Sequence, residues 1–202
     1  MSLRLPLAAM AIALSAAFPA AAHIAVYETT LRGDIEFPNP VDTPGTGTAL
    51  VTIDDHLNTM RVQVTFSDLV GNVTVAHIHC CTAAAGTGGS GVASPLPTFP
   101  EFPVGVKFGS YDQTFDMGAA SSYGSGFLTA NGNNPLTAFS ALITGIAEGK
   151  AYLNIHTEFV GSGEIRGFLA PVPEPETYAL LLGGLGLVGF AARRKATVRS
   201  SA

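Results

Sequence analysis

The chain has 202 residues, of which 47% are hydrophobic and 12% charged, and its formal net charge is −5. Between residues 23 and 171, thirteen acidic side chains outnumber five basic ones, a formal net charge of −8. Nucleic acids and anionic lipids attract positive charge, so this balance excludes nucleic acid as a partner of the central region. A span of roughly 150 residues predicts one domain with its own core.

The first 22 residues are typical of a secretory signal peptide. Arg4 supplies the positive charge, residues 5–18 form an apolar stretch, and Ala20-Ala21-Ala22 is a small-residue cleavage site. We therefore expect cleavage after Ala22, which leaves a domain that extends from residue 23 to residue 170.

Alternating, β-branched segments predict an all-β domain with one short helix. The expected strands are residues 25–31, 48–54, 60–66, 73–78, 111–117, 151–156 and 164–169. Short strands with turn residues at intervals of about 8–12 positions are typical of an immunoglobulin-like or Greek-key β-sandwich. The helix is expected over residues 136–147, where apolar residues from Phe139 to Ile146 recur at helical spacing.

A long segment from Cys80 to Pro103 is rich in Ala, Gly, Ser, Thr and Pro. Its length predicts a loop that is either functional or loosely ordered. The two cysteines of the chain, Cys80 and Cys81, are adjacent at its start. Three interpretations stay open for them: a disulfide between neighbours, two thiol ligands of a metal, or two half-buried apolar side chains. A disulfide between neighbours connects nothing distant, so we expect it to add little stability.

His77 and His79 lie two residues apart on one expected strand, so both side chains point to the same face. With His156 on a later strand, they can bind copper or zinc, and Cys80 or Cys81 would make the ligand set mixed nitrogen and sulfur. The competing interpretation is a hydrogen-bonded polar cluster that holds the strands in register and that Glu164 and Arg166 join as a pair. Apart from this copper or zinc site, the sequence predicts no cofactor.

The sequence contains no Gly-x-Ser-x-Gly nucleophile motif and no phosphate-binding loop. A metal site alone does not imply catalysis, because catalysis needs an open coordination position. We therefore expect a protein that is not an enzyme and that acts in adhesion, as a structural component or as a binding module, with an extracellular polysaccharide as one partner. The alternative is a metal-binding, redox-active domain.

Residues 171–202 form a tail of three parts. They are Pro173, Glu174 and Pro175, an apolar Gly-rich run over about residues 177–192, and the basic residues Arg193, Arg194 and Lys195. The apolar run is short for a spanning helix, which needs roughly 20 residues, and the basic residues favour a stop on the cytoplasmic side. These parts, in this order, resemble the bacterial PEP-CTERM sorting signal. The resemblance implies a transmembrane helix, an exosortase-type sorting enzyme, cleavage near Pro-Glu-Pro, and delivery to the cell surface or extracellular matrix.

The domain itself resembles the CHRD domain. The resemblance is carried by His77-Ile78-His79 and by two later segments, residues 152–157 and 163–167. It implies an immunoglobulin-like β-sandwich and no particular biochemical activity, and Cys80-Cys81 departs from the family pattern. The His-x-His strand is also similar to one in copper-zinc superoxide dismutase, an enzyme that has more ligand histidines than this chain offers.

Overall fold

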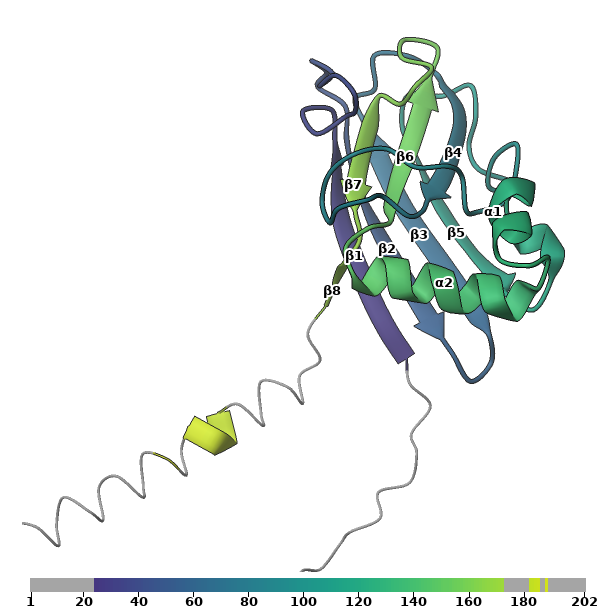
Figure 1. The fold of residues 1–202 in the computed structure, drawn as a ribbon. Helices are drawn as coiled ribbons and strands as arrows, with labels where there is room; N and C mark the ends of the chain where they lie inside the picture. The colour runs from purple at the N-terminus through teal and green to yellow at the C-terminus, as the bar shows by residue number, and fades with distance from the viewer. Residues whose placement is uncertain (1–23, 173–181, 186–187, 189–202) are drawn as a thin grey trace, which may run out of the picture.

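The computed structural model describes residues 24–172, 182–185 and 188 (Figure 1). The predicted signal peptide and the basic residues 193–195 lie outside the described residues, as do the Pro-Glu-Pro motif and most of the apolar run over residues 177–192. None of the helices in the described ranges combines the length and the apolar character that crossing a bilayer requires.

Every predicted strand is present, and none of its ends differs from the prediction by more than two residues. The strands are β1 (Ile24–Arg32), β2 (Thr46–Asp54), β3 (Thr59–Ser67), β4 (Val73–His79), β5 (Gly109–Asp116), β6 (Tyr152–Thr157), β7 (Ile165–Phe168) and β8 (Ala170–Pro171). They form one antiparallel sheet in the order β4-β6-β7-β1-β2-β3-β5, with β8 paired to β1. The apolar alternation therefore predicted the all-β class and the positions of the strands correctly.

The predicted β-sandwich is not confirmed, because the strands belong to one curled sheet, a half-barrel, instead of two packed sheets (Figure 1). β1, β2 and β3 pair along their whole nine-residue lengths, and the natural twist of such long pairs curls the sheet around its own apolar face. An alternating strand has one buried face in either architecture, so the sequence pattern does not distinguish them.

β4 and β5 are the two edges of this sheet, and the segment between them closes the open side of the half-barrel. The backbone N–H of Phe99 donates to the carbonyl of Ala76 in β4 at 3.1 Å. The Phe99 ring packs against Tyr111 and Phe115 of β5, with ring centroids 5.7 and 5.6 Å apart. The later part of the long segment that follows Cys80 thus belongs to the core, through Ala93, Phe99 and Phe102.

The predicted helix is α2 (Pro135–Ala147), which lies across the half-barrel in Figure 1. The Asn134 side chain accepts from the backbone N–H groups of Leu136 and Thr137, at 2.9 and 3.2 Å, and so caps the first turn. Two further short elements precede it, the 3₁₀ turn η1 (Ala120–Ser122) and α1 (Ser125–Ala130). The sequence did not predict α1, because it is six residues long and no side chain caps its start.

The second half of β4 and nearly all of β6 are buried on both faces. One face carries apolar residues such as Ile78 and Ile155, which belong to the hydrophobic core. The other face carries polar and aromatic residues. They are His77 and His79 on β4, and Tyr152, Asn154 and His156 on β6. Loop segments around Ser90 and Pro97 cover this second face, and they place a group of histidines inside the protein.

Candidate metal centre

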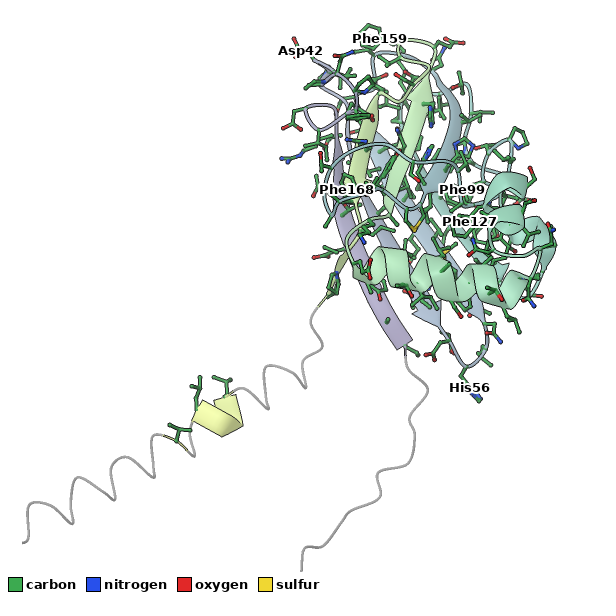
Figure 2. The ribbon with its side chains drawn as sticks, viewed as in Figure 1. Asp42, His56, Phe99, Phe127, Phe159 and Phe168 are labelled. Atoms are coloured by element: carbon green, nitrogen blue, oxygen red, sulfur yellow. A yellow bond between two sulfur atoms is a disulfide. The ribbon has the colours of Figure 1, made fainter. Side chains whose placement is uncertain are left out.

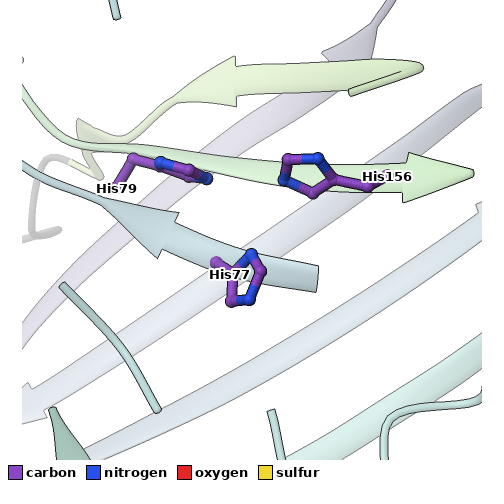
Figure 3. A group of neighbouring side chains, drawn as sticks. All are labelled: His77, His79 and His156. Carbon is purple, nitrogen blue, oxygen red and sulfur yellow. The ribbon is translucent and has the colours of Figure 1, made fainter. Parts of the chain in front are cut away.

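The three predicted histidines come together on the covered face of β4 and β6 (Figure 3). The ring centroids are 5.6 Å apart for His77 and His79, 5.3 Å for His77 and His156, and 5.7 Å for His79 and His156. β6 lies beside β4 with Val75 opposite His156, which puts all three side chains on one face. We call this group the histidine cluster.

Each ring is oriented by a backbone carbonyl from a loop. The contacts are His77 Nε2 to Pro97 O at 2.5 Å, His79 Nδ1 to Ser90 O at 2.9 Å, and His156 Nδ1 to Gly161 O at 2.9 Å. A carbonyl only accepts hydrogen bonds, so the bonded nitrogen carries the proton and the other nitrogen keeps a lone pair. The same arrangement orients histidine ligands in metal sites.

The second nitrogen of each ring is buried and has no hydrogen-bond partner: His77 Nδ1, His79 Nε2 and His156 Nε2. The rings do not bond to one another, so the predicted hydrogen-bonded cluster leaves three acceptors unsatisfied, at a cost of about 1–3 kcal/mol each. One ligand nitrogen from each histidine lies within 4.8 Å of those of the other two. Zinc bound tetrahedrally holds its nitrogens about 3.4 Å apart, so closure by up to about 1.4 Å would form the site.

The electrostatics keep all three rings neutral. Burial lowers the pKa of His77, His79 and His156, and for His79 it lowers the pKa to about 4. A proton on either neighbouring ring, and the charge of Arg166, would lower the pKa of His79 further. Neutral imidazole is the form that binds metals, so the histidine cluster needs no deprotonation at neutral pH.

The structure joins Cys80 and Cys81 in a disulfide, and it does not bring their sulfurs into the histidine cluster. Cys80 follows His79 directly, so its side chain points to the opposite face of the chain. There both sulfurs lie against Gly145 of α2, where an added Cβ would overlap them. Within residues 24–172, the histidine cluster consists of imidazoles alone.

A buried ion pair lies beside the histidine cluster and was not predicted. Glu36 Oε2 is 3.8 Å from Arg166 Nε, and the two side chains are 2% and 4% exposed. Burial raises the pKa of Glu36 to about 7, although Arg166 acts to lower it. Asn154 Nδ2 lies 3.5 Å from the same carboxylate. Asn154 and Arg166 belong to the segments that carried the family resemblance, whereas Glu36 lies in a loop without any motif.

Unsatisfied acceptors are concentrated in this one region. Five buried side-chain polar atoms in the described part of the chain lack a partner: the three free ring nitrogens, Glu36 Oε1 and Asn154 Oδ1. With the amide oriented as in the structure, all five are acceptors. A cation is the kind of ligand that such a group of acceptors favours.

The face of the His79 ring is also packed against an aromatic side chain. Tyr152 stacks on it in parallel, with ring centroids 4.8 Å apart. The guanidinium of Arg166 lies 4.9 Å from the Tyr152 centroid, and its NH1 donates to Gly88 O at 2.8 Å. These contacts fix the direction in which the free nitrogen of His79 points.

Glu164 does not pair with Arg166, so that prediction is wrong. Its carboxylate accepts from the hydroxyls of Thr43 and Thr157, at 2.6 and 2.7 Å, and from the N–H groups of Val70 and Gly71, at 2.7 and 3.1 Å. Burial acts to raise the pKa of Glu164, but these donors outweigh it and hold the pKa below its usual value. Glu164 is therefore a structural anchor that joins three loops next to β6.

Comparison with known proteins supports both sequence resemblances. A family model described as the CHRD domain matches residues 27–169, and one described as the PEP-CTERM protein-sorting motif matches residues 171–195. No curated protein and no solved structure matches the chain.

Proposed function

Since the chain belongs to the CHRD domain family and carries a PEP-CTERM protein-sorting motif, we propose that it delivers a domain that binds one zinc or copper ion to the cell surface or extracellular matrix. The sorting motif marks an exported protein that associates with the membrane and is handled by an exosortase-type sorting system. The metal ligands in this proposal are His77, His79 and His156.

One observation carries the proposal: the three rings face one another, and each has a buried nitrogen without a partner while its other nitrogen is bonded to a carbonyl (Figure 3). Imidazole nitrogen suits zinc and copper, whereas magnesium and calcium prefer oxygen ligands. When bound, the ion would supply the missing partner for each lone pair.

The proposed role is non-enzymatic. The free nitrogens of the histidine cluster are shielded from solvent by the loop segments that carry Ser90, Pro97 and Gly161. Catalytic metal sites keep a coordination position open to substrate, and such shielding favours a stabilising or metal-holding role.

The test is metal analysis of protein purified from its native envelope, by inductively coupled plasma mass spectrometry. We expect about one zinc or copper ion per chain. His77→Ala, His79→Ala and His156→Ala should each reduce this to background, because two imidazoles hold an ion far less tightly than three.

The matched control is His56→Ala. His56 lies in the turn between β2 and β3, at the opposite end of the half-barrel from Phe159, and it should leave the metal content unchanged (Figure 2). A wild-type protein that is folded and metal-free, even after dialysis against zinc and copper, would overturn the proposal.

We also propose adhesion to an extracellular polysaccharide, on the outer face of β1, β2, β3 and β5. A hollow of about 820 Å³ lies over this face. It presents one row of hydroxyls and a second row that contains acidic and amide side chains. The first row is Thr30, Thr48, Thr65 and Ser110, and the second includes Glu28, Gln63 and Asp112. Side chains of these kinds hydrogen-bond sugar hydroxyls, and the acidic groups favour a neutral or amino-sugar polymer over an anionic one.

For this second role we expect neutral or amino-sugar polysaccharide to bind in isothermal titration calorimetry. Gln63→Ala combined with Asp112→Ala should weaken binding at least tenfold, because both side chains line the hollow. Glu158→Ala, on the turn after β6, is the control and should bind as the wild type does. Equal binding by the double variant would exclude this face.

A further inference from the structure

The Cys80–Cys81 disulfide joins a buried residue, Cys80, to one that is exposed to solvent, Cys81. Cys81 is exposed, and it lines a hollow of about 490 Å³ beside α2 together with Thr137 and Thr144. Cys80 lines a second hollow, of about 380 Å³, together with Phe127. A thiolate opens a disulfide by direct attack on a sulfur atom, so accessible disulfides are the ones that exchange.

The same disulfide is linked directly to a residue of the histidine cluster. The backbone N–H of Cys80 donates to Gly91 O at 3.1 Å, and the neighbouring Ser90 O accepts from the His79 ring. His79 also forms a β-bridge with Val92. One short segment, residues 90–92, therefore holds both the start of the disulfide and the His79 imidazole.

Closure of the disulfide restricts the backbone next to His79. A bond between adjacent cysteines forms an eight-membered ring that includes their peptide bond, so few torsions remain free between Cys80 and Cys81. The sulfurs are seated against Gly145, which has no side chain to displace them. Opening the ring restores this freedom one residue away from His79.

We propose that Cys80–Cys81 is a redox-active site that reacts with dithiol reductants, and that its oxidation state sets the position of the His79 ring and the metal affinity of the histidine cluster. The metal-affinity part rests on the proposed function. The sulfurs face α2 and do not themselves join the ligand set, so the coupling acts through the backbone and the segment 90–92.

A dithiol reduces the Cys80–Cys81 disulfide in two thiol–disulfide exchange steps. A thiolate of the reductant attacks the sulfur of Cys81, the residue of the pair that is exposed, the bond between Cys80 and Cys81 breaks, and Cys80 leaves as a thiolate that takes up a proton. The second thiolate of the reductant then attacks the reductant sulfur in the mixed disulfide and releases Cys81 as a thiolate, which is also protonated. The dithiol loses two electrons and becomes a disulfide, and the protein gains them as two thiols.

The first part of the test measures whether a dithiol reaches the disulfide in the folded protein. The folded full-length protein is treated with dithiothreitol, freed of reductant, labelled with N-ethylmaleimide and weighed by intact mass spectrometry. We expect two labels per chain without denaturant and none in the sample that was not reduced. Labelling only after unfolding would show that the disulfide is inert and would overturn the proposal.

The second part measures the coupling. Zinc affinity is determined by chelator competition for the oxidised protein and for the Cys80→Ser, Cys81→Ser double variant, which lacks both the bond and the thiols. We expect at least tenfold weaker binding in the double variant, the effect typical of losing a group that orients a ligand. Ala83→Ser, in the same exposed loop, is the control and should bind as the wild type does. Equal affinities would overturn the coupling and leave the proposed metal function standing.

A readout that needs no metal separates the two proposals. The ring resonances of His79 are assigned with His79→Gln and followed by nuclear magnetic resonance as the metal-free protein is reduced. We expect the His79 signals to move more than those of His156. Movement in a protein that binds neither zinc nor copper would support the coupling and reject the metal function, whereas unmoved His79 signals would reject the coupling.

Discussion

Glu164→Ala is expected to lower the free energy of unfolding by roughly 4 kcal/mol. The substitution leaves two hydroxyls and two backbone N–H groups, from Thr43, Val70, Gly71 and Thr157, without their acceptor. A buried donor without a partner costs about 1–3 kcal/mol, and water that enters the gap recovers part of this. Urea unfolding followed by circular dichroism at neutral pH measures the change.

Two variants control this prediction. Glu158→Ala removes an exposed carboxylate that accepts from Asn72 at 2.9 Å, and it should change the free energy of unfolding by less than about 1 kcal/mol. Glu164→Gln keeps one acceptor oxygen and should fall between the wild type and Glu164→Ala. A loss below 1 kcal/mol for Glu164→Ala would mean that the three loops are held together by other contacts.

The metal-free domain is expected to lose stability as the pH falls from 6.5 toward 4. The pKa of His79 is lowered from 6.5 to about 4, so the unfolded state binds more protons than the folded state in this window. The contribution of the neutral rings to the free energy of unfolding is fully present above pH 6.5, and His79 alone accounts for about 3 kcal/mol of it. His77 and His156, with pKa values shifted in the same direction, add to the loss.

Glu36 changes the stability of the domain with pH in the direction opposite to that of His79. Its pKa is raised from 4.5 to about 7, so its contribution to stability is present below pH 4.5 and is lost as the pH rises through 7. Glu36→Gln should therefore make the domain more stable than the wild type at pH 8 and should steepen the loss in acid. His79→Gln should flatten the acid loss. Urea unfolding between pH 4 and pH 8 measures all three proteins, and equal slopes in all of them would contradict both assignments.

Local patterns predicted much of the fold because strand alternation, turn residues and helix caps act within a few residues. The strands and α2 follow from such patterns, and so does the shared face of His77 and His79. The meeting of these two with His156 depends on β6 lying beside β4, a pairing between residues that are nearly eighty positions apart. Sequence periodicity carries no information about which strands become neighbours.

The surroundings of the histidine cluster were even less predictable. Pro97, Ser90 and Gly161 act through backbone carbonyls, which every residue possesses, so no residue type signals their role. Glu36 comes from the loop after β1, and only the folding of that loop over β6 and β7 places it against Arg166. The expected pairing of Glu164 with Arg166 failed because Glu164 turns instead toward donors from two distant loops.

The amino-acid order alone was enough to identify the family and the sorting motif, the strands with their buried faces, and the three candidate ligands. Those properties depend on residues that are close together in the sequence. The single curled sheet, the neutral tautomers of the three rings, the five acceptors without partners and the position of the disulfide arise only in the folded molecule. They depend on contacts between distant segments and on burial, and both come into being when the half-barrel closes.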